Sequence, residues 1–335
     1  MARPYQDCPN VGQVRRHVAT LASASLPMYG SLYYAKNLDH PSPCQYVGSG
    51  TNDTGEAFAV GPTTHSSSFD RGRAHADIYR GPWSSPGDFF KARAHCEMAC
   101  INRPSSFPAP QGFFVGPNQY LPSRKLKIEV LQNYLKVAAQ ILPKNEAHSK
   151  SVLWHTDLHG GNIFVDPAEP TKIVNIIDWQ GVNISPCFIQ ACHPALINLQ
   201  DHVPEDLMTP VHLPDGLDEM PKDEQERVKN LFGAQAIYQV YEIDLIRECR
   251  DAGLALQFKN TLPAHITSAA RTIFADGEPD LLGMLIRLQG NWHKIDPSLP
   301  CPLAFTPEDR QRHARLDARW QAGYDLLDDL WYEMG

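Results

Sequence analysis

The stretch LWHTDLHGGNIFVD, residues 153–166, determines how the rest of the chain is interpreted. It places His155, Asp157, His159 and Asn162 within eight positions. One aspartate and one asparagine in a loop are ordinary turn formers, so these residues alone do not indicate a functional site. The segments that follow them in the chain decide the interpretation.

Two strand-like segments come next. Ile163–Val165 and Ile173–Ile177 are apolar runs, and the turn-forming stretch DPAEPTK separates them. Asp178 comes directly after the second run. A β-hairpin would therefore bring Asn162, which precedes the first strand, beside Asp178, which ends the second.

The spacing of these polar residues suits phosphoryl transfer. Asp157 and Asn162 are five positions apart, and Asp178 lies twenty-one positions after Asp157. An aspartate at the start of such a loop can orient an acceptor hydroxyl, while an asparagine oxygen and a second aspartate hold Mg²⁺ against the phosphates. The alternative is that the polar loop and the second apolar run are unrelated. Asp178 would then be only the capping residue of a buried strand.

The pattern H-x-D-L-H-x-x-N, then a strand, a short turn and I-D-W, resembles the aminoglycoside phosphotransferase/choline kinase-like superfamily. The strings MYGSLYYAKNL, FAVGP, RGPW, YLKVAAQILPKN and IIDWQ are similar to the fungal branch related to altered inheritance of mitochondria protein nine. The resemblance runs from about residue 12 to about residue 295. It implies an α+β, protein kinase-like fold, mostly the helical C-terminal lobe, with a small β-hairpin that carries the catalytic and metal loops.

The resemblance also implies roles for individual residues. Asp157 would be the catalytic base, and His155, the second residue of the catalytic set, would support the loop through hydrogen bonds. Asn162 and Asp178 would bind Mg²⁺ and, through it, ATP. His159 would pack below the loop.

Two positions depart from the family pattern. Thr156 replaces the more usual glycine or proline. Gln180 stands where many antibiotic kinases carry an acidic residue, although glutamine is familiar in the fungal branch.

The expected domains are a post-hinge segment with a loop-rich insert (1–122), a helical C-lobe (123–300) and a C-terminal helix (301–335). By the resemblance, the matched segments begin after the hinge, and about a dozen residues precede them. Five strands cannot be built from that length. We therefore expect the N-terminal β-lobe, which clamps the nucleotide, to be absent or truncated.

Periodicity and capping signals place the helices. We expect helices over 12–24, 86–102, 123–142 and 223–258, two more within 262–290, and a last one from Thr306, with strands over 30–38 and 56–62 in the first part. Ser85 and Thr306 are good capping residues, each followed by a proline at the first helical position. Gly233 is an expected break in the long helix.

Composition excludes several classes of protein. The 335 residues carry a net charge of −8, which argues against a broad nucleic-acid footprint, and no apolar run is long enough to span a membrane. The eight cysteines are scattered, and AHCEMAC and CFIQACH lack C-x-x-C spacing, so they indicate buried thiols rather than zinc ligands. The glycines at 48, 50 and 55 indicate a plain loop.

Two functions are consistent with these patterns. The first is ATP- and Mg²⁺-dependent phosphorylation of a hydroxyl group on an unknown small molecule, impaired here if the nucleotide-clamping lobe is missing. The second is a non-catalytic, pseudokinase-type binding or scaffold protein, with a protein partner covering the face of the missing lobe. An unrelated metal-dependent hydrolase is a third interpretation. The resemblance implies a mitochondrial location, and the cytoplasm is the alternative. The acidic loop 201–224 would suit a cationic acceptor, or it is simply solvated.

Overall fold

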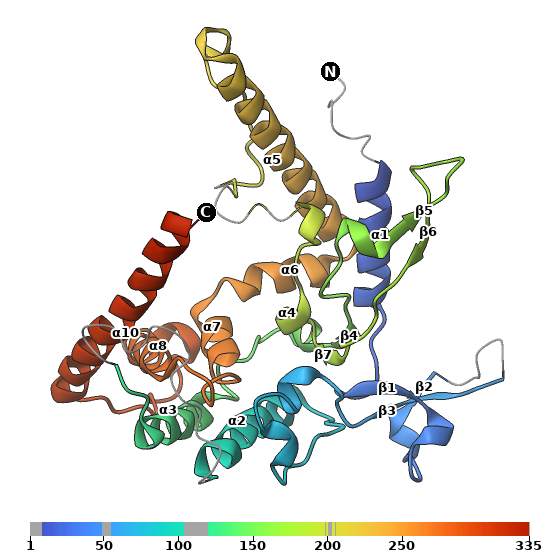
Figure 1. The fold of residues 1–335 in the computed structure, drawn as a ribbon. Coiled ribbons are helices and arrows are strands. Elements are labelled where there is room, and N and C mark those ends of the chain that lie inside the picture. Colours follow the sequence, from blue (N-terminus) through green and yellow to red (C-terminus); the bar gives the residue numbers. More distant parts are fainter. Residues whose placement is uncertain are drawn as a thin grey trace. The chain divides into compact units, whose positions relative to one another are not determined.

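The computed structural model of the chain describes residues 9–48, 55–103, 120–197, 199, 203–204 and 206–334. It is an α+β structure dominated by helices (Figure 1). The elements, in chain order, are α1 (Pro9–Ser23), β1 (Ser31–Tyr34), β2 (Tyr46–Val47), β3 (Phe58–Gly61), α2 (Pro86–Asn102), α3 (Arg124–Val137), β4 (Ser151–Leu153), β5 (Ile163–Val165), β6 (Ile173–Ile176), β7 (Ile184–Pro186), α4 (Cys187–Gln190), α5 (Lys222–Glu248), α6 (Arg250–Lys259), α7 (Leu262–Ala269), α8 (Glu278–Gly290), α9 (Trp292–Ile295) and α10 (Pro307–Met334).

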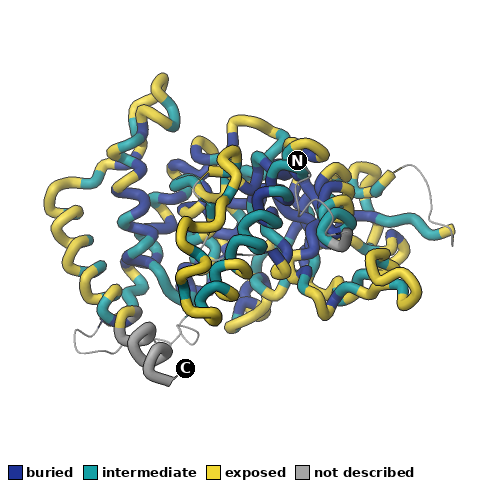
Figure 2. Tube along the Cα trace, turned by 90° about the horizontal axis from the view of Figure 1, so that it is seen from above, coloured by how far each residue is buried: buried dark blue, intermediate teal, exposed yellow. Residues whose placement is uncertain are grey.

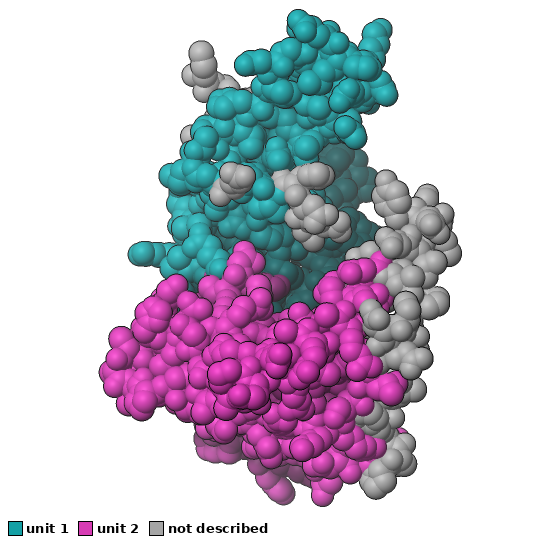
Figure 3. All heavy atoms as spheres, turned by 90° about the vertical axis from the view of Figure 1, so that its left-hand side faces the viewer, with its two compact units in different colours: residues 1–26, 146–257 teal, residues 27–145, 258–335 magenta. Residues whose placement is uncertain are grey.

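The chain divides into two compact units, which are coloured separately in Figure 3. Unit 1 combines residues 1–26 with 146–257, and unit 2 combines residues 27–145 with 258–335. Each unit therefore joins segments that are far apart in the sequence. The division into domains expected from the family resemblance stays a prediction.

Unit 1 is built around α1, which packs against α5 and β4. Arg15 of α1 forms ion pairs with Asp244 and, at 2.7 Å, with Glu248 of α5. Strand β4 pairs antiparallel with β7, and the amide of Leu26 donates to the Ser151 carbonyl at 2.8 Å. These contacts hold the start of the β4 strand, from which the polar loop emerges.

The hairpin β5–β6 forms where the sequence predicts it. Its strands are antiparallel, with Ile163 opposite Ile176 and Phe164 opposite Asn175. The side chain of Gln13, from α1, bonds to the connection between the strands: it donates to the Thr171 carbonyl and accepts from the Ile173 amide at 2.8 Å. A side chain from α1 thus completes hydrogen bonds that a two-stranded hairpin leaves open.

Unit 2 contains the sheet β1–β3–β2, in which both outer strands pair antiparallel with β3. The expected strand over 30–38 is shorter than predicted, because a 3-10 turn over Ala35–Asn37 follows Tyr34. The short strand β2 directly precedes the loop predicted from the glycines at 48, 50 and 55.

The core of unit 2 is helical. Helix α3 contacts α2 and α8, and α8 also contacts α7 and α10. Figure 2 shows buried and exposed residues alternating within helical turns, as expected for amphipathic helices. Ser85 caps α2 by accepting from the Asp88 amide at 3.1 Å, and Thr306 caps α10 by accepting from the Asp309 amide at 3.2 Å. Both predicted caps are confirmed.

Two ion pairs lie inside this core. Lys127 of α3 and Glu278 of α8 are fully buried and 2.7 Å apart, and Lys127 also donates to the Ile273 carbonyl at 2.6 Å. Arg73 and Glu97 form a second buried pair at 2.7 Å. Burial of these charges is tolerable because each pair is also hydrogen-bonded.

Several predictions about regular structure were wrong. Helix α5 continues through Gly233 and ends at Glu248, followed by α6 from Arg250. A glycine inside a long helix costs about 1 kcal/mol, which good helix formers around it can outweigh. The region after residue 123 holds a second strand pair, β4–β7, in addition to the predicted hairpin. Residues 104–119, within the expected loop-rich insert, lie outside the described residues. No helix in the described part of the chain combines the length and the apolar character needed to cross a bilayer.

Candidate functional site

The polar loop begins where β4 ends. The amide of His159 donates to the Asp157 carbonyl at 3.1 Å, and the amide of Asn162 donates to the His159 carbonyl at 3.0 Å. A 3-10 turn over Gly160–Asn162 then leads directly into β5. The loop is thus folded back on itself by its own backbone.

Asn162 is oriented by this loop. Its side chain is only 5% exposed, and its Nδ2 donates to the Asp157 carbonyl at 2.9 Å. A carbonyl only accepts, so the amide nitrogen must face Asp157 and the amide oxygen must face away from it. Within the described part of the chain, no donor bonds to the Oδ1 atom, so this oxygen is available as a ligand.

The hairpin brings Asp178 beside Asn162, as predicted. The amide of Ile177 donates to the Asn162 carbonyl at 3.0 Å, so Asp178 follows the residue paired with Asn162. Asp178 has a left-handed backbone, with φ of 64°. That conformation is uncommon for a residue with a Cβ and is often found at functional sites, although aspartate tolerates it better than most residues do.

His155 connects the loop to the end of β6. Its ring is buried, and its Nε2 lies 2.8 Å from the Ile177 carbonyl, so Nε2 carries the proton. Its ring also meets the Trp179 ring edge-on, with centroids 4.9 Å apart. The hydrogen bond of His155 therefore goes to the residue next to Asp178, outside the loop, and the supporting role of His155 stays a prediction.

The carboxylate of Asp157 faces outward. Its side chain is 74% exposed, and its Oδ2 lies 4.0 Å from Nε2 of His159. Nδ1 of His159 accepts from the Gly161 amide at 3.0 Å, so the proton resides on Nε2, on the side of Asp157. A protonated His159 would be an electrostatic partner for that carboxylate.

His159 was expected to pack below the loop, and that expectation was wrong. Its side chain is 46% exposed and caps the 3-10 turn instead. Gly161 explains the arrangement, because a Cβ there would come within 2.9 Å of the His159 ring. The missing side chain at Gly161 thus gives the imidazole room to fold over the turn.

The donor set suits a hard cation. Asn162 offers an amide oxygen and Asp178 offers a carboxylate. In the described part of the chain, no group of three or more histidine, cysteine, aspartate or glutamate side chains is arranged so that it could hold a metal ion. Mg²⁺ commonly uses one or two protein oxygens and takes its remaining ligands from water and phosphate. The residues present therefore fit Mg²⁺ better than zinc.

Two features of the site were not predicted from sequence. One is the carbonyl of Ile177, which accepts from His155 and ties the loop to the strand end. The other is Trp179, whose ring contacts His155 and whose Nε1 donates to the Ile176 carbonyl at 2.8 Å. The IIDW string contains Trp179, but backbone acceptors such as Ile177 leave no sequence signal.

Comparison with known proteins supports the family resemblance. The model of the "Phosphotransferase enzyme family" matches residues 98–188, a span that includes the loop and the hairpin. Two subtelomeric hrmA-associated cluster proteins, from two strains of Aspergillus fumigatus, are each 28% identical over 339 residues. The alignments cover 90% of this chain and 63% of each relative, so the chain spans less than two thirds of the relatives' length.

No solved structure matches the chain. The alignments cover only part of each relative. The expected absence of an N-terminal β-lobe stays a prediction. The loop motif, the hairpin geometry and the family match agree on the same segment. Residues 98–188 are therefore similar to the phosphotransferase enzyme family.

Proposed function

We propose that this chain carries the catalytic loop of an ATP- and Mg²⁺-dependent phosphotransferase that acts on a hydroxyl group of a small molecule. The observation that carries the proposal is the orientation of Asn162. Its amide nitrogen is held by the Asp157 carbonyl, which leaves its oxygen available, and its backbone bonds to Ile177, the neighbour of Asp178. One hydrogen bond thus connects the proposed base to the proposed metal ligand.

Asn162 and Asp178 are the residues that would hold Mg²⁺. The bound ion would neutralise charge on the phosphates of the nucleotide. The contribution of the chain is positioning: burial fixes Asn162, and the pairing of Ile177 with Asn162 fixes the approach of Asp178. Such positioning accounts for much of phosphoryl-transfer catalysis.

Asp157 would accept or orient the proton of the acceptor hydroxyl. Its carboxylate is exposed, so an acceptor can reach it, while its backbone carbonyl is held by His159 and Asn162. The carboxylate of the base would therefore be accessible to an acceptor, while the backbone of the same residue is held in place. The nearest ring nitrogen, Nε2 of His159, lies 4.0 Å from Oδ2 of Asp157.

His155 would be a positioning residue rather than a catalytic one. It touches the Ile177 carbonyl and the Trp179 ring, the neighbours of Asp178 on either side. Its hydrogen bond would keep the left-handed Asp178 in place. Loss of that bond should weaken the metal site more than the base.

Binding of Mg·ATP to the purified chain, measured by titration calorimetry, tests the proposal. We expect micromolar binding that is lost in Asp178→Ala. Glu169→Ala is the matched control, since it removes a carboxylate from the exposed turn of the same hairpin. Asp178→Asn separates the charge from the backbone conformation, because asparagine also tolerates a left-handed backbone.

Absence of binding up to millimolar Mg·ATP would overturn the enzymatic proposal for this chain. It would favour the alternative, a non-catalytic binding protein of the same family. Binding that survives Asp178→Ala would instead contradict the assigned metal ligand.

A further inference from the structure

The segment that follows β7 runs alongside the chain that leads into the polar loop, and both lie in unit 1. The amide of Cys187 donates to the Lys150 carbonyl at 2.9 Å. Further along, Nε2 of Gln190 donates to the Val152 carbonyl at 2.6 Å. Figure 1 shows α4 beside β7, the strand that pairs with β4. The bonded positions advance in the same direction in both segments, so the chain after β7 follows β4 towards the loop.

Beyond α4, this segment bonds to the loop on either side of Asp157. The Sγ atom of Cys192 lies 3.9 Å from the Thr156 carbonyl, which makes a weak hydrogen bond. The amide of Ala195 donates to the Leu158 carbonyl at 2.9 Å. The carbonyl of Asp157 itself accepts from donors within the loop. Three consecutive carbonyls around the proposed base are therefore all bonded, and the outer two depend on the segment 192–195.

One side chain between these two contacts ties the segment to α5. Nε2 of His193 forms a hydrogen-bonded ion pair with the carboxylate of Glu242. An ionised carboxylate only accepts, so Nε2 carries the proton. The imidazole also packs against two tyrosines of α5, with centroids 4.7 Å from the Tyr238 ring and 5.9 Å from the Tyr241 ring. His193 is thus held both by direction and by packing.

The burial of Glu242 calls for an explanation. Its side chain is almost completely buried, and a buried carboxylate is costly unless it is paired. An apolar residue at this position could fill the same space without that cost. A hydrogen bond adds direction to the contact, because it fixes where the ring of His193 lies. The positions of Cys192 and Ala195, which bond to the loop, are fixed with it.

We infer that His193 and Glu242 are positioning residues for Asp157. The inference rests on the proposed function, since it assumes that Asp157 acts as the base. The pair holds the segment 192–195 against α5, and that segment holds the carbonyls of residues 156 and 158. The backbone of Asp157 is thereby fixed from α5 as well as from the hairpin, while its carboxylate stays open to an acceptor hydroxyl.

Hydrogen–deuterium exchange of the full chain, followed by mass spectrometry, tests the positioning without any substrate. Glu242→Leu removes the acceptor of His193, so amides within 155–162 and 191–197 should exchange about tenfold faster. Glu242→Gln keeps an acceptor and should exchange like the unaltered chain. His193→Phe keeps a ring against Tyr238 but removes the donor, and it should behave like Glu242→Leu. Unchanged exchange of the α3 peptide would show that each variant is folded.

Gln239→Leu is the matched control on the same helix. Nε2 of Gln239 donates to the carbonyls of Asp206 and Thr209, at 2.9 and 2.8 Å, so it ties a different segment to α5. Its loss should speed exchange within 206–211 and leave the loop unchanged. Equal acceleration of the loop in Gln239→Leu and Glu242→Leu would indicate a general loosening of α5 and would overturn the inference.

Turnover is the second readout. Release of ADP from Mg·ATP, with water as the acceptor, should fall about tenfold in Glu242→Leu and recover in Glu242→Gln. The dissociation constant of Mg·ATP should stay within about twofold, because the hairpin holds the proposed metal ligands. Unchanged loop exchange in both Glu242→Leu and His193→Phe, or an ADP release that Glu242→Leu leaves unaltered, would overturn the inference. If the unaltered chain binds no Mg·ATP, the proposed function fails instead, and exchange still decides whether the pair holds the loop.

Discussion

The polar loop of unit 1 and the helical core of unit 2 use charged residues in opposite ways. In the loop, Asp157 leaves its carboxylate largely exposed, and only its backbone carbonyl is bonded. In the core, Lys127 and Glu278 are fully buried and satisfy each other. An exposed charged group without an ion-pair partner indicates a role in catalysis or binding. A charged group that is buried and paired indicates a structural role. Four predictions can break or sharpen this comparison.

The largest effect is expected on activity, from Asp157→Asn. Loss of a general base typically lowers a rate by roughly 10²–10⁴-fold. Since the side chain is exposed and makes no hydrogen bond within the described residues, the free energy of unfolding should change by less than about 0.5 kcal/mol. Release of ADP from Mg·ATP and urea unfolding measure the two quantities.

Asp166→Asn is the matched control, since Asp166 lies in the turn of the same hairpin. Equal rates for Asp157→Asn and the unaltered chain would remove Asp157 from the mechanism. A large decrease in the free energy of unfolding of Asp157→Asn would show that Asp157 has a structural role in the loop.

The next effect is expected on stability, from Lys127→Met. This change removes the ammonium partner of the buried Glu278 carboxylate, which still accepts from the Ser123 amide at 3.1 Å. Removing one member of a buried ion pair costs about 3–5 kcal/mol. The free energy of unfolding should fall by that amount, and Lys127→Met combined with Glu278→Leu should recover part of the loss.

Lys125→Met, at an exposed position of the same helix, controls for the change of side chain. A loss below about 1 kcal/mol in Lys127→Met would mean that the buried pair contributes nothing beyond a hydrophobic replacement.

A smaller effect is expected from the cap of α2. Ser85 accepts from the Asp88 amide and donates to the Asp88 carboxylate at 2.7 Å. Ser85→Ala should lower the free energy of unfolding by about 1 kcal/mol, because one amide of the first turn loses its acceptor. Ser84→Ala, at the exposed neighbouring position, should have no measurable effect in the same denaturation experiment.

The smallest effect is a dependence on pH at His65. Burial, followed by the charges of Arg271 and Arg93, lowers the pKa of His65 from its ordinary value of 6.5, and Asp70 opposes them. The unfolded chain therefore binds a proton more readily than the folded chain does. The stabilisation is present above pH 6.5 and is lost as the pH falls through that value.

Partial exposure of His65 limits this contribution to roughly a few tenths of a kcal/mol. Its Nδ1 accepts from the Ser67 amide at 3.2 Å, a role that asparagine can also fill. His65→Asn should therefore reduce the loss of stability between about pH 7.5 and 5.5. An unchanged slope would show that His65 is not among the titrating groups.

Local signals in the sequence predicted much of the site and many of the helices. The hairpin, its turn and the capping of α2 by Ser85 depend on neighbouring residues, so spacing alone was enough to locate them. The nearness of Asn162 and Asp178 was a consequence of the hairpin. The assignments of Asp157, His155, Asn162 and Asp178 to catalysis and metal binding stay predictions until activity is measured.

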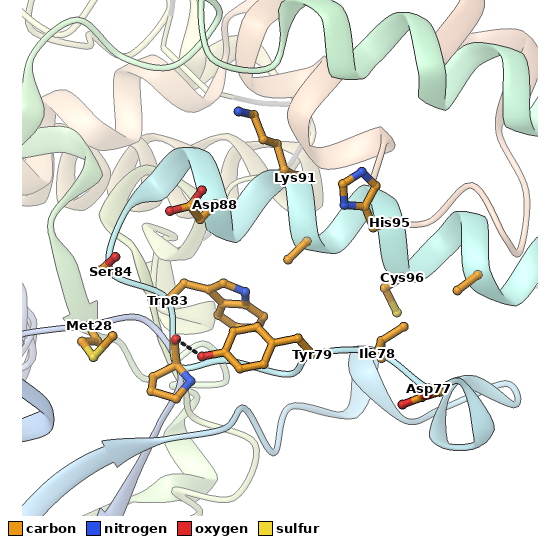
Figure 4. Close-up of a pocket in the computed structure, with 13 residues that line it drawn as sticks. Met28, Asp77, Ile78, Tyr79, Trp83, Ser84, Asp88, Lys91, His95 and Cys96 are labelled. Carbon is orange, nitrogen blue, oxygen red and sulfur yellow. Dashed lines mark hydrogen bonds between the residues drawn. The ribbon is translucent and has the colours of Figure 1, made fainter. Parts of the chain in front are cut away.

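Features that depend on distant partners could not be predicted in the same way. Strands β4 and β7 are three residues each and exist because they pair across more than thirty positions. The buried charges Arg73 and Glu97 have the same residue types as surface positions, and only their partner identifies them. A cavity beside Trp83 lies between α2 and segment 77–84 (Figure 4). The hydrophobic periodicity of the sequence does not predict that these two segments pack together.

The contact of Gln13 with the hairpin has a consequence for changes to the beginning of the chain. One amide side chain of α1 bonds to Thr171 and Ile173, on the segment that leads to Asp178. Shortening α1, or replacing Gln13 with alanine, would leave the loop motif unchanged in sequence while releasing the turn of the hairpin. Ligand affinity at Asp178 would then report on a residue that lies more than 160 positions away along the chain.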